Sequence, residues 1–174
     1  MPPNAVWCAE PGATFVTLRW SNGELQGCIG SLEAVRAIVD DVAHNAVAAC
    51  TRDPRGMPVT HDNIDQLDVD LSMLSPLEPI AFRDEASALA AIRVGIDGIV
   101  LIHRMRRATF LSVVWEAFPT ATAFIGELKR KGGLPREFWS DDIRLLRYTT
   151  VRCVDPAPRQ RTPGHSASEP RGHA

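Results

Sequence analysis

The sequence has no apolar run long enough to cross a membrane and no recognisable export signal. None of its stretches approaches the roughly 18 apolar residues that a spanning helix requires. Its beginning, MPPNAVWCAEPG, lacks the basic end followed by an apolar segment that marks a secretory leader. These absences predict a cytosolic protein.

Cysteine is scarce, and its spacing matches no ligand or disulfide pattern. The cysteines are unevenly spaced and form neither a CxxC pair nor a CxxC…HxxxH arrangement: Cys8, Cys28, Cys50 and Cys153. Such spacing suggests neither a zinc site nor a disulfide framework. His61 and His103 also lack a partner at ligand-like spacing. We therefore expect reduced thiols, no metal and no cofactor.

A large excess of one charge is missing too. The formal net charge of -2 gives no bulk attraction to nucleic acid or to an anionic membrane. A local basic patch is still conceivable, formed by Arg104, Arg106, Arg107, Lys129, Arg130 and Lys131. Its only candidate stacking partners, Trp115, Phe138 and Trp139, belong to no known nucleic-acid motif. An RNA-associated factor is thus an alternative hypothesis.

What the sequence contains fits one globular domain. Its 174 residues are 45% hydrophobic and 23% charged, so a sizeable core can be buried. We expect an extended arm over residues 1–12, a domain over 13–154 and a disordered tail over 155–174. The tail has too few apolar residues to offset the entropy of ordering.

Two segments show the alternation of strands. TFVTLRW (residues 14–20) is rich in β-formers, and Ser21-Asn22-Gly23 predicts a hairpin turn into a return strand over residues 24–29. In LDVDLSM (residues 67–73), apolar and polar residues alternate without interruption, which predicts a strand with one face on the core.

One long helix is predicted over residues 33–50. Its apolar residues recur at helical spacing and form one stripe: Val35, Ile38, Val39, Val42, Ala46, Val47 and Cys50. Ser31 is the expected N-cap, and Glu33 places a negative charge in the first turn.

The remaining elements alternate between helices and strands. We expect a helix over residues 84–93 that is capped by Asp84. A hairpin should follow, with strands over 99–103 and 108–111 and a basic tip at 104–107. Two helices over 112–118 and 120–131 and a closing strand over 143–151 complete the domain. This succession predicts an α+β fold.

The stretch LQGCIGS (residues 25–31) is the main candidate site. Cys28 would lie where a strand ends and a helix begins, so the backbone amides of the first helical turn would stabilise its thiolate. The flanking glycines would let a substrate approach the sulfur. No base is identifiable, because His44 should face away from the buried stripe. The alternative is a small residue packed at a tight strand exit, with glycines needed for backbone geometry.

Two pairs of charged residues are further candidates. Asp53 and Arg55, on either side of Pro54, could orient a polar ligand beside LQGCIGS. Alternatively, Asp53 could satisfy loop amides while Arg55 forms a surface or inter-lobe ion pair. Asp68 and Asp70 share a strand face, as carboxylates for metal or acid–base work would, although alternation alone explains them.

Several short blocks, in order, resemble the AMMECR1 family over residues 12–151: LQGCIG, Asn45-Ala46, RDPR (52–55), LDVDLSMLSP, GIDGIVL, RRATFLSVVW, LKRKGGLP and WSDD. The resemblance implies a two-lobed α+β fold with a mostly antiparallel sheet flanked by helices. It implies a pocket at Gly27, Cys28, Ile29 and Gly30, with Asp53 and Arg55 nearby. The family's activity is not established. The resemblance implies that bacterial members act as partners of a Memo-like protein and a radical-SAM protein, which together form the AmmeMemoRadiSam system.

The sequence departs from the family pattern in four places. Gln26 stands where arginine is usual, Gly56 where phenylalanine is usual and Ser112 where proline is usual. A short arm replaces the family's first helix. The Gln26 departure argues against anion binding at that position.

Two functional hypotheses follow for a member of such a family. The first is an enzyme that uses Cys28 as its nucleophile. The second is a non-catalytic adaptor that presents its surface to protein partners.

Overall fold

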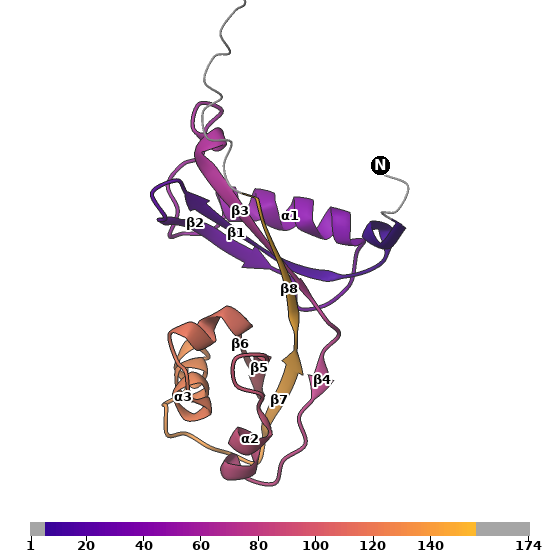
Figure 1. Cartoon of the computed structure of the whole chain (residues 1–174). Helices are drawn as coiled ribbons and strands as arrows, with labels where there is room; N and C mark the ends of the chain where they lie inside the picture. Colours follow the sequence, from indigo (N-terminus) through magenta and orange to yellow (C-terminus); the bar gives the residue numbers. More distant parts are fainter. Residues whose placement is uncertain (1–5, 156–174) are drawn as a thin grey trace, which may run out of the picture.

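The computed structural model describes residues 6–155, which form two lobes, each built on a four-stranded antiparallel sheet (Figure 1). The first lobe (residues 6–74 and 150–155) holds the strands β2 (Leu25–Gly30), β1 (Ala13–Trp20), β3 (Leu67–Leu74) and β8 (Thr150–Asp155), in that order across the sheet. The second lobe (residues 78–148) has the order β4 (Glu78–Pro79), β7 (Ile143–Tyr148), β5 (Gly98–His103) and β6 (Arg106–Phe110). The predicted α+β, mostly antiparallel, two-lobed fold is confirmed.

Helices pack on the sheets of both lobes. The helix α1 (Ile38–Thr51) covers one face of the first sheet, and the short 3-10 helix η2 (Ile64–Gln66) precedes β3. The second lobe contains α2 (Glu85–Ala91), the 3-10 helix η3 (Ser112–Glu116) and α3 (Ala121–Lys131). None of the helices between residues 6 and 155 is long and apolar enough to cross a membrane.

The predicted closing strand is two strands in different sheets. β7 pairs with β4 and β5 in the second lobe, whereas β8 pairs with β3 in the first. At the crossing, the Ser75 N–H donates to the Thr149 carbonyl at 2.9 Å, and the Thr149 N–H donates to Ser75 Oγ at 3.0 Å. The break is invisible in the sequence because both strands consist of strand-forming residues, so only pairing partners distinguish them.

The first hairpin forms as the sequence predicts. Gly23 adopts a φ of 87°, which only glycine reaches without strain, and the Gly23 N–H donates to the Trp20 carbonyl at 2.7 Å. β1 pairs with β2 on one side and with β3 on the other. Its inward residues Val16 and Leu18 form a core with Ala49 of α1.

The long helix begins later than predicted, at Ile38 rather than at residue 33. Tertiary hydrogen bonds hold the preceding loop out of the helix: the Gly12 N–H donates to the Arg36 carbonyl at 3.1 Å, and the Ile38 N–H donates to the Glu10 carbonyl at 2.9 Å. Ser31 is therefore not the N-cap, a position that Ala37 occupies without a side-chain hydrogen bond.

The buried face of α1 matches the predicted stripe only in part: Val42, Ala46 and Cys50 of the stripe pack against the first-lobe core. The buried residues of α1 are Asp41, Asn45, Ala48 and Ala49, whereas Val39 and Val47 are 50% and 62% exposed. Polar contacts select this face, because Asp41 Oδ2 accepts from the Thr14 N–H at 2.9 Å and Asn45 Nδ2 donates to the Thr14 carbonyl at 3.0 Å.

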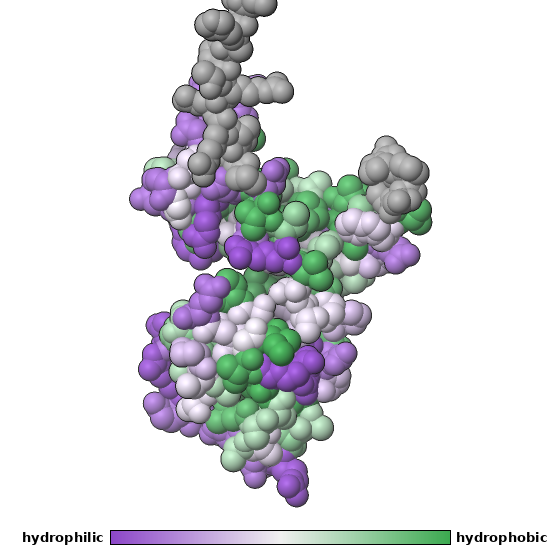
Figure 2. Space-filling model, in the orientation of Figure 1, coloured by the Kyte–Doolittle hydropathy of each residue, from purple (hydrophilic) through white to green (hydrophobic). Residues whose placement is uncertain are grey.

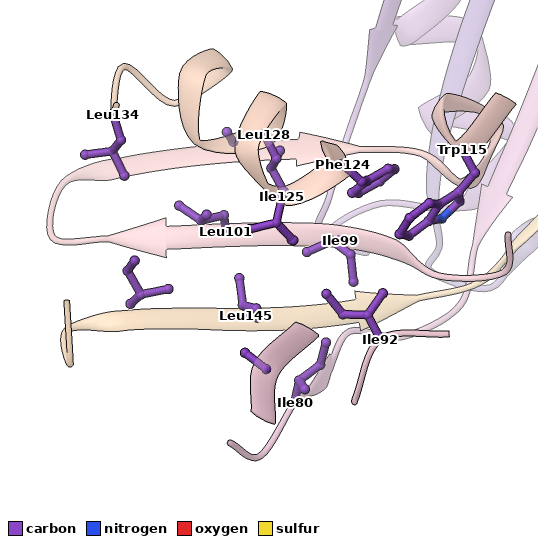
Figure 3. Close-up of a cluster of buried hydrophobic side chains, with 13 residues drawn as sticks. Ile80, Ile92, Ile99, Leu101, Trp115, Phe124, Ile125, Leu128, Leu134 and Leu145 are labelled. Carbon is purple, nitrogen blue, oxygen red and sulfur yellow. The ribbon is translucent and has the colours of Figure 1, made fainter. Parts of the chain in front are cut away.

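The second lobe encloses the larger core. Side chains from α3, β5 and β7 meet between the helix and the sheet (Figure 3), among them Ile99, Leu101, Phe124, Leu128 and Leu145. The Asp84 cap is confirmed, with a capping box to Ser87 that opens α2. The hairpin tip is shorter than predicted, since β6 already begins at Arg106.

The predicted terminal segments lie mostly beyond the described residues. Within the predicted extended arm, Val6–Ala9 form the 3-10 helix η1, and Pro11 bridges to Ala37. Residues 1–5, and the predicted tail after Asp155, lie outside the described part of the chain.

Candidate functional site

A groove of about 510 Å³ lies where the two lobes meet, and it contains most of the LQGCIGS stretch. The first lobe contributes Phe15, Leu32, Val35 and the run from Cys28 to Ser31, together with Glu33; the second lobe contributes Arg107 and Thr109 of β6. The surface is also indented between the lobes in Figure 2.

Cys28 lies within β2, directly opposite Thr17 of β1. The hydroxyl of Thr17 donates to Cys28 Sγ at 3.1 Å, and the Cys28 N–H donates to Asp53 Oδ2 at 2.9 Å. The prediction that Cys28 lies at a helix start is wrong, because β2 continues to Gly30 and α1 begins only at Ile38. First-turn amides therefore do not act on this thiol.

Asp53 and Arg55 are brought next to Cys28 by the loop after α1. Arg55 donates from Nε to Asp53 Oδ1 at 2.9 Å and from an Nη to Oδ2 at 2.6 Å. The Arg55 guanidinium, helped by the backbone N–H groups of Cys28 and Arg55, holds the pKa of Asp53 well below its ordinary value. The buried carboxylate thus stays ionised and fixes Arg55 beside the thiol.

Lys131, at the end of α3, brings a further positive charge to this place. Its Nζ donates to the Thr109 carbonyl at 2.9 Å and lies 5.0 Å from the centre of the Phe110 ring. Desolvation lowers the pKa of Lys131, and the neighbouring Arg55 lowers it too, while the Cys28 thiol acts in the opposite direction. The thiol also interacts electrostatically with Arg55. Arg55, bound to the carboxylate that accepts from the Cys28 N–H, and Lys131, bound to Thr109 of the groove wall, therefore bring one cation from each lobe to this part of the molecule.

The glycines beside Cys28 are required by packing. A Cβ on Gly27 would lie 2.2 Å from the Ala49 carbonyl oxygen of α1, and a Cβ on Gly30 would lie 2.2 Å from the Phe15 ring. At Gly27 protein atoms already fill the space that a side chain would take, so a substrate cannot approach there, whereas Gly30 borders the groove. Ile29 packs against the core beneath α1 and also borders the groove.

The departures from the family pattern have structural explanations here. Gln26 is buried, donates to the Met57 carbonyl at 2.8 Å and accepts from the Met57 N–H at 3.1 Å. A Cβ on Gly56 would lie 2.1 Å from the Gln26 carbonyl oxygen. Ser112 Oγ lies 2.9 Å from Thr150 Oγ1, a contact between the lobes. Gln26 and Gly56 hold the loop after α1 and do not line the groove.

Of the other carboxylate candidates, Asp70 is engaged by a neighbouring strand. Asp70 forms a bidentate ion pair with Arg152 of β8, with Nε–Oδ1 at 2.9 Å. Residues 6–155 contain no group of three or more His, Cys, Asp or Glu side chains arranged to hold a metal ion. His103 is buried, and its ring packs against Phe138 with a centroid distance of 5.0 Å.

The hypothetical basic patch does not form one open surface. Its cations are divided among separate acidic partners: Arg104 pairs with Asp142, Arg107 with Glu33, Lys129 with Glu85 and Arg130 with Glu127. Arg106 donates to the carbonyls of Gly132 and Gly133. Trp115 is buried and stacks on Phe124. With Lys131 bound to the Thr109 carbonyl, each of the six cations has a partner within the chain, and these contacts add no support to the RNA-binding hypothesis.

Several residues of the site were not expected from the sequence, among them Phe15, Thr17, Thr109 and Lys131. Phe15 and Thr17 reach it because the β1–β2 register places them opposite Gly30 and Cys28. Thr109 and Lys131 reach it only because the second lobe stands against the first. The alternation of β1 could have indicated the first two, whereas no local signal indicates the others.

Comparison with known proteins gives a consistent picture. The sequence profile of the AMMECR1 family matches residues 2–153. A protein of Methanothermobacter thermautotrophicus is 36% identical over 136 residues, covering 77% of this chain and 70% of the relative. A Thermotoga maritima protein is 33% identical over 151 residues, covering 86% and 81%. The crystal structure of the uncharacterized protein PH0010 from Pyrococcus horikoshii matches with a TM-score of 0.80 at 27% identity, covering 91% of this chain and 82% of that one.

Proposed function

This chain belongs to the AMMECR1 family, and we propose that its inter-lobe groove is a reaction site in which the Cys28 thiol attacks an electrophilic carbon. The sulfur forms a bond to that carbon while the carbon's bond to its leaving group breaks. The leaving group departs with the bonding electron pair and takes up the proton of the thiol. The reaction is thus a group transfer to Cys28, completed when water or an amine displaces the group.

The position of the thiol in the groove carries this proposal. Cys28 borders the groove, and the Thr17 hydroxyl donates to its sulfur at 3.1 Å, which orients the thiol. The Cys28 N–H donates to Asp53 Oδ2, which also binds the Arg55 guanidinium, and Lys131 of the second lobe donates to the carbonyl of Thr109, a residue of the groove wall. The thiol is thus held at the groove, with a cation from each lobe in its surroundings.

Alkylation of the full chain by iodoacetamide at pH 7, followed by mass spectrometry, tests the proposal. Cys50 is the internal control because it is also partly buried and burial raises its thiol pKa, while Cys153 is exposed and shows the rate of an accessible thiol. We expect Cys28 to react faster than both, and Lys131→Met to slow Cys28 alone. Equal labelling of Cys28 and Cys153 in the unaltered chain would contradict a reactive thiol.

A second candidate function is that of an adaptor for a Memo-like and a radical-SAM partner. An exposed apolar stripe on the outer face of α1 supports it: Val39, Ala43 and Val47 follow one another at intervals of one helical turn. Solvent-facing apolar stripes are common where proteins dock. If the chain is only an adaptor, V39K/V47K abolishes binding to the Memo-like protein, whereas Cys28→Ser leaves both binding and function unchanged.

A further inference from the structure

The cations around the groove differ in how well they are neutralised. Arg55 is held by the ionised Asp53 carboxylate through two hydrogen bonds. Lys131 forms no ion pair with any described residue, and its Nζ donates only to the neutral carbonyl of Thr109. Lys131 does not itself line the groove, but it binds Thr109, which does, so it leaves a positive charge, with no ion-pair partner in the described chain, behind the second-lobe wall of the groove.

Arg107 adds a cation whose partner can be exchanged. Its Nη donates to Glu33 Oε1 at 2.8 Å, which joins β6 of the second lobe to the loop after β2 in the first. The two side chains are 38% and 65% exposed, and exposed ion pairs of this kind are weak in water. Both residues line the groove beside Thr109 and Cys28.

From this arrangement we propose that the groove binds a small molecule with a carboxylate or phosphate group, which Lys131 and Arg107 recognise after the group displaces Glu33. The guanidinium of Arg107 offers the planar fork that both anions accept, and Lys131 offers a point charge. The inference rests on the proposed function in one respect: the anionic group anchors the ligand so that its reactive carbon reaches Cys28.

Glu33 then acts as a competitor built into the chain. Its carboxylate binds Arg107 at 2.8 Å and must leave when the ligand's anion arrives. The second lobe thus holds the anionic end of the ligand, while the first lobe presents the thiol.

Titration of the full chain with inorganic phosphate and, separately, with succinate tests the inference, with amide chemical shifts of Cys28, Thr109 and Lys131 as the readout. Binding of one anion and not the other identifies the head group. We expect Glu33→Gln to tighten binding about threefold and Lys131→Met to weaken it about tenfold, because removing a competing or a recognising charge alters affinity by roughly 1 kcal/mol. Arg107→Met should weaken it similarly.

Arg104→Met is the matched control, because Arg104 is an exposed second-lobe cation whose partner Asp142 does not line the groove, whereas the partner of Lys131, Thr109, does. Cys28→Ser separates the two proposals: anion binding should persist in this variant even though alkylation at that position is lost. Shifts that do not saturate, or that weaken equally in Arg104→Met and Lys131→Met, overturn the anion site and leave the reactivity of Cys28 to be judged by its own experiment. Thermal unfolding of each variant confirms that it is folded.

Discussion

The backbone N–H of Cys28 donates to Oδ2 of Asp53 at 2.9 Å across 25 residues of sequence. The same carboxylate binds the Arg55 guanidinium through both oxygens. One ionised group, the Asp53 carboxylate, therefore holds both the edge strand β2, which carries the thiol, and the Arg55 guanidinium. A change at Asp53 should be felt both in stability and at Cys28.

Asp53→Asn is expected to lower the free energy of unfolding by about 1–3 kcal/mol. The amide retains the shape of the side chain but loses the charge-assisted bonds to Arg55 and the acceptor strength toward the Cys28 N–H. Urea unfolding measures this loss. Asp141→Asn, at an exposed position, is the control and should leave the unfolding midpoint unchanged. An equal effect of both substitutions would show that Asp53 has no special structural role.

The stability of the chain should fall in acid partly because of Asp53. Its pKa in the folded state lies below its ordinary value, so the unfolded chain binds the proton first as the pH decreases. The stabilisation is complete above pH ~4, the ordinary aspartate range, and is lost progressively below it. Urea unfolding between pH 6 and 3 should show a shallower decline in Asp53→Asn than in the unaltered chain. Asp84, whose pKa is also lowered by its bonds to Ser87, supplies part of the remaining slope.

Gly27→Ala and Gly126→Ala should change stability in opposite directions. A methyl group at Gly27 meets the Ala49 carbonyl oxygen at 2.2 Å, so α1 must move away from β2, at a cost of about 1–3 kcal/mol. At Gly126, within α3, the nearest atoms are 3.8 Å away, and alanine should stabilise the helix by about 0.5–1 kcal/mol. Thermal unfolding of both variants provides the comparison. A stabilised Gly27→Ala would mean that the strand and helix are not in close contact.

Tyr148 is the single tyrosine of the chain, so its ionisation can be followed directly by ultraviolet absorbance. Burial raises the pKa of Tyr148 to about 12, with a smaller opposing effect from its hydrogen bond to Thr109. The unfolded chain releases this proton near pH 10, so stability should decline as the pH rises from about 10 through about 12. Phenolate absorbance appearing near pH 10 in the folded chain would contradict the burial of this ring. Tyr148→Phe should abolish the signal.

The sequence predicted those elements whose causes are local. The Asn22-Gly23 turn, the alternation that became β3 and the Asp84 cap depend on residues within a few positions of one another, and all three are confirmed. The start of α1 was predicted wrongly because residues 10–12 capture backbone groups of the following loop. Its buried face was wrong in part because the polar bonds of Thr14 outweigh the burial of Val39 and Val47.

For the site, the sequence singled out Cys28, Asp53 and Arg55, and the fold places these residues together. Local patterns could not show that Lys131 and Thr109 would join them, since these lie in the other lobe. Nor could they show that Asp70 would be occupied by Arg152, which is 82 residues away.

By itself, then, the sequence determined the class of the fold, the short-range turns and caps, and the stretch around Cys28 as the place to examine. The tertiary structure alone decided which sheet receives β7 and β8, where the thiol lies relative to a helix, and which charges surround it. The physical reason is the sequence separation of the residues that interact. Turns and caps arise from neighbours along the chain, whereas strand partners and pairs such as Glu33–Arg107, 74 residues apart, exist only after two lobes have folded and met.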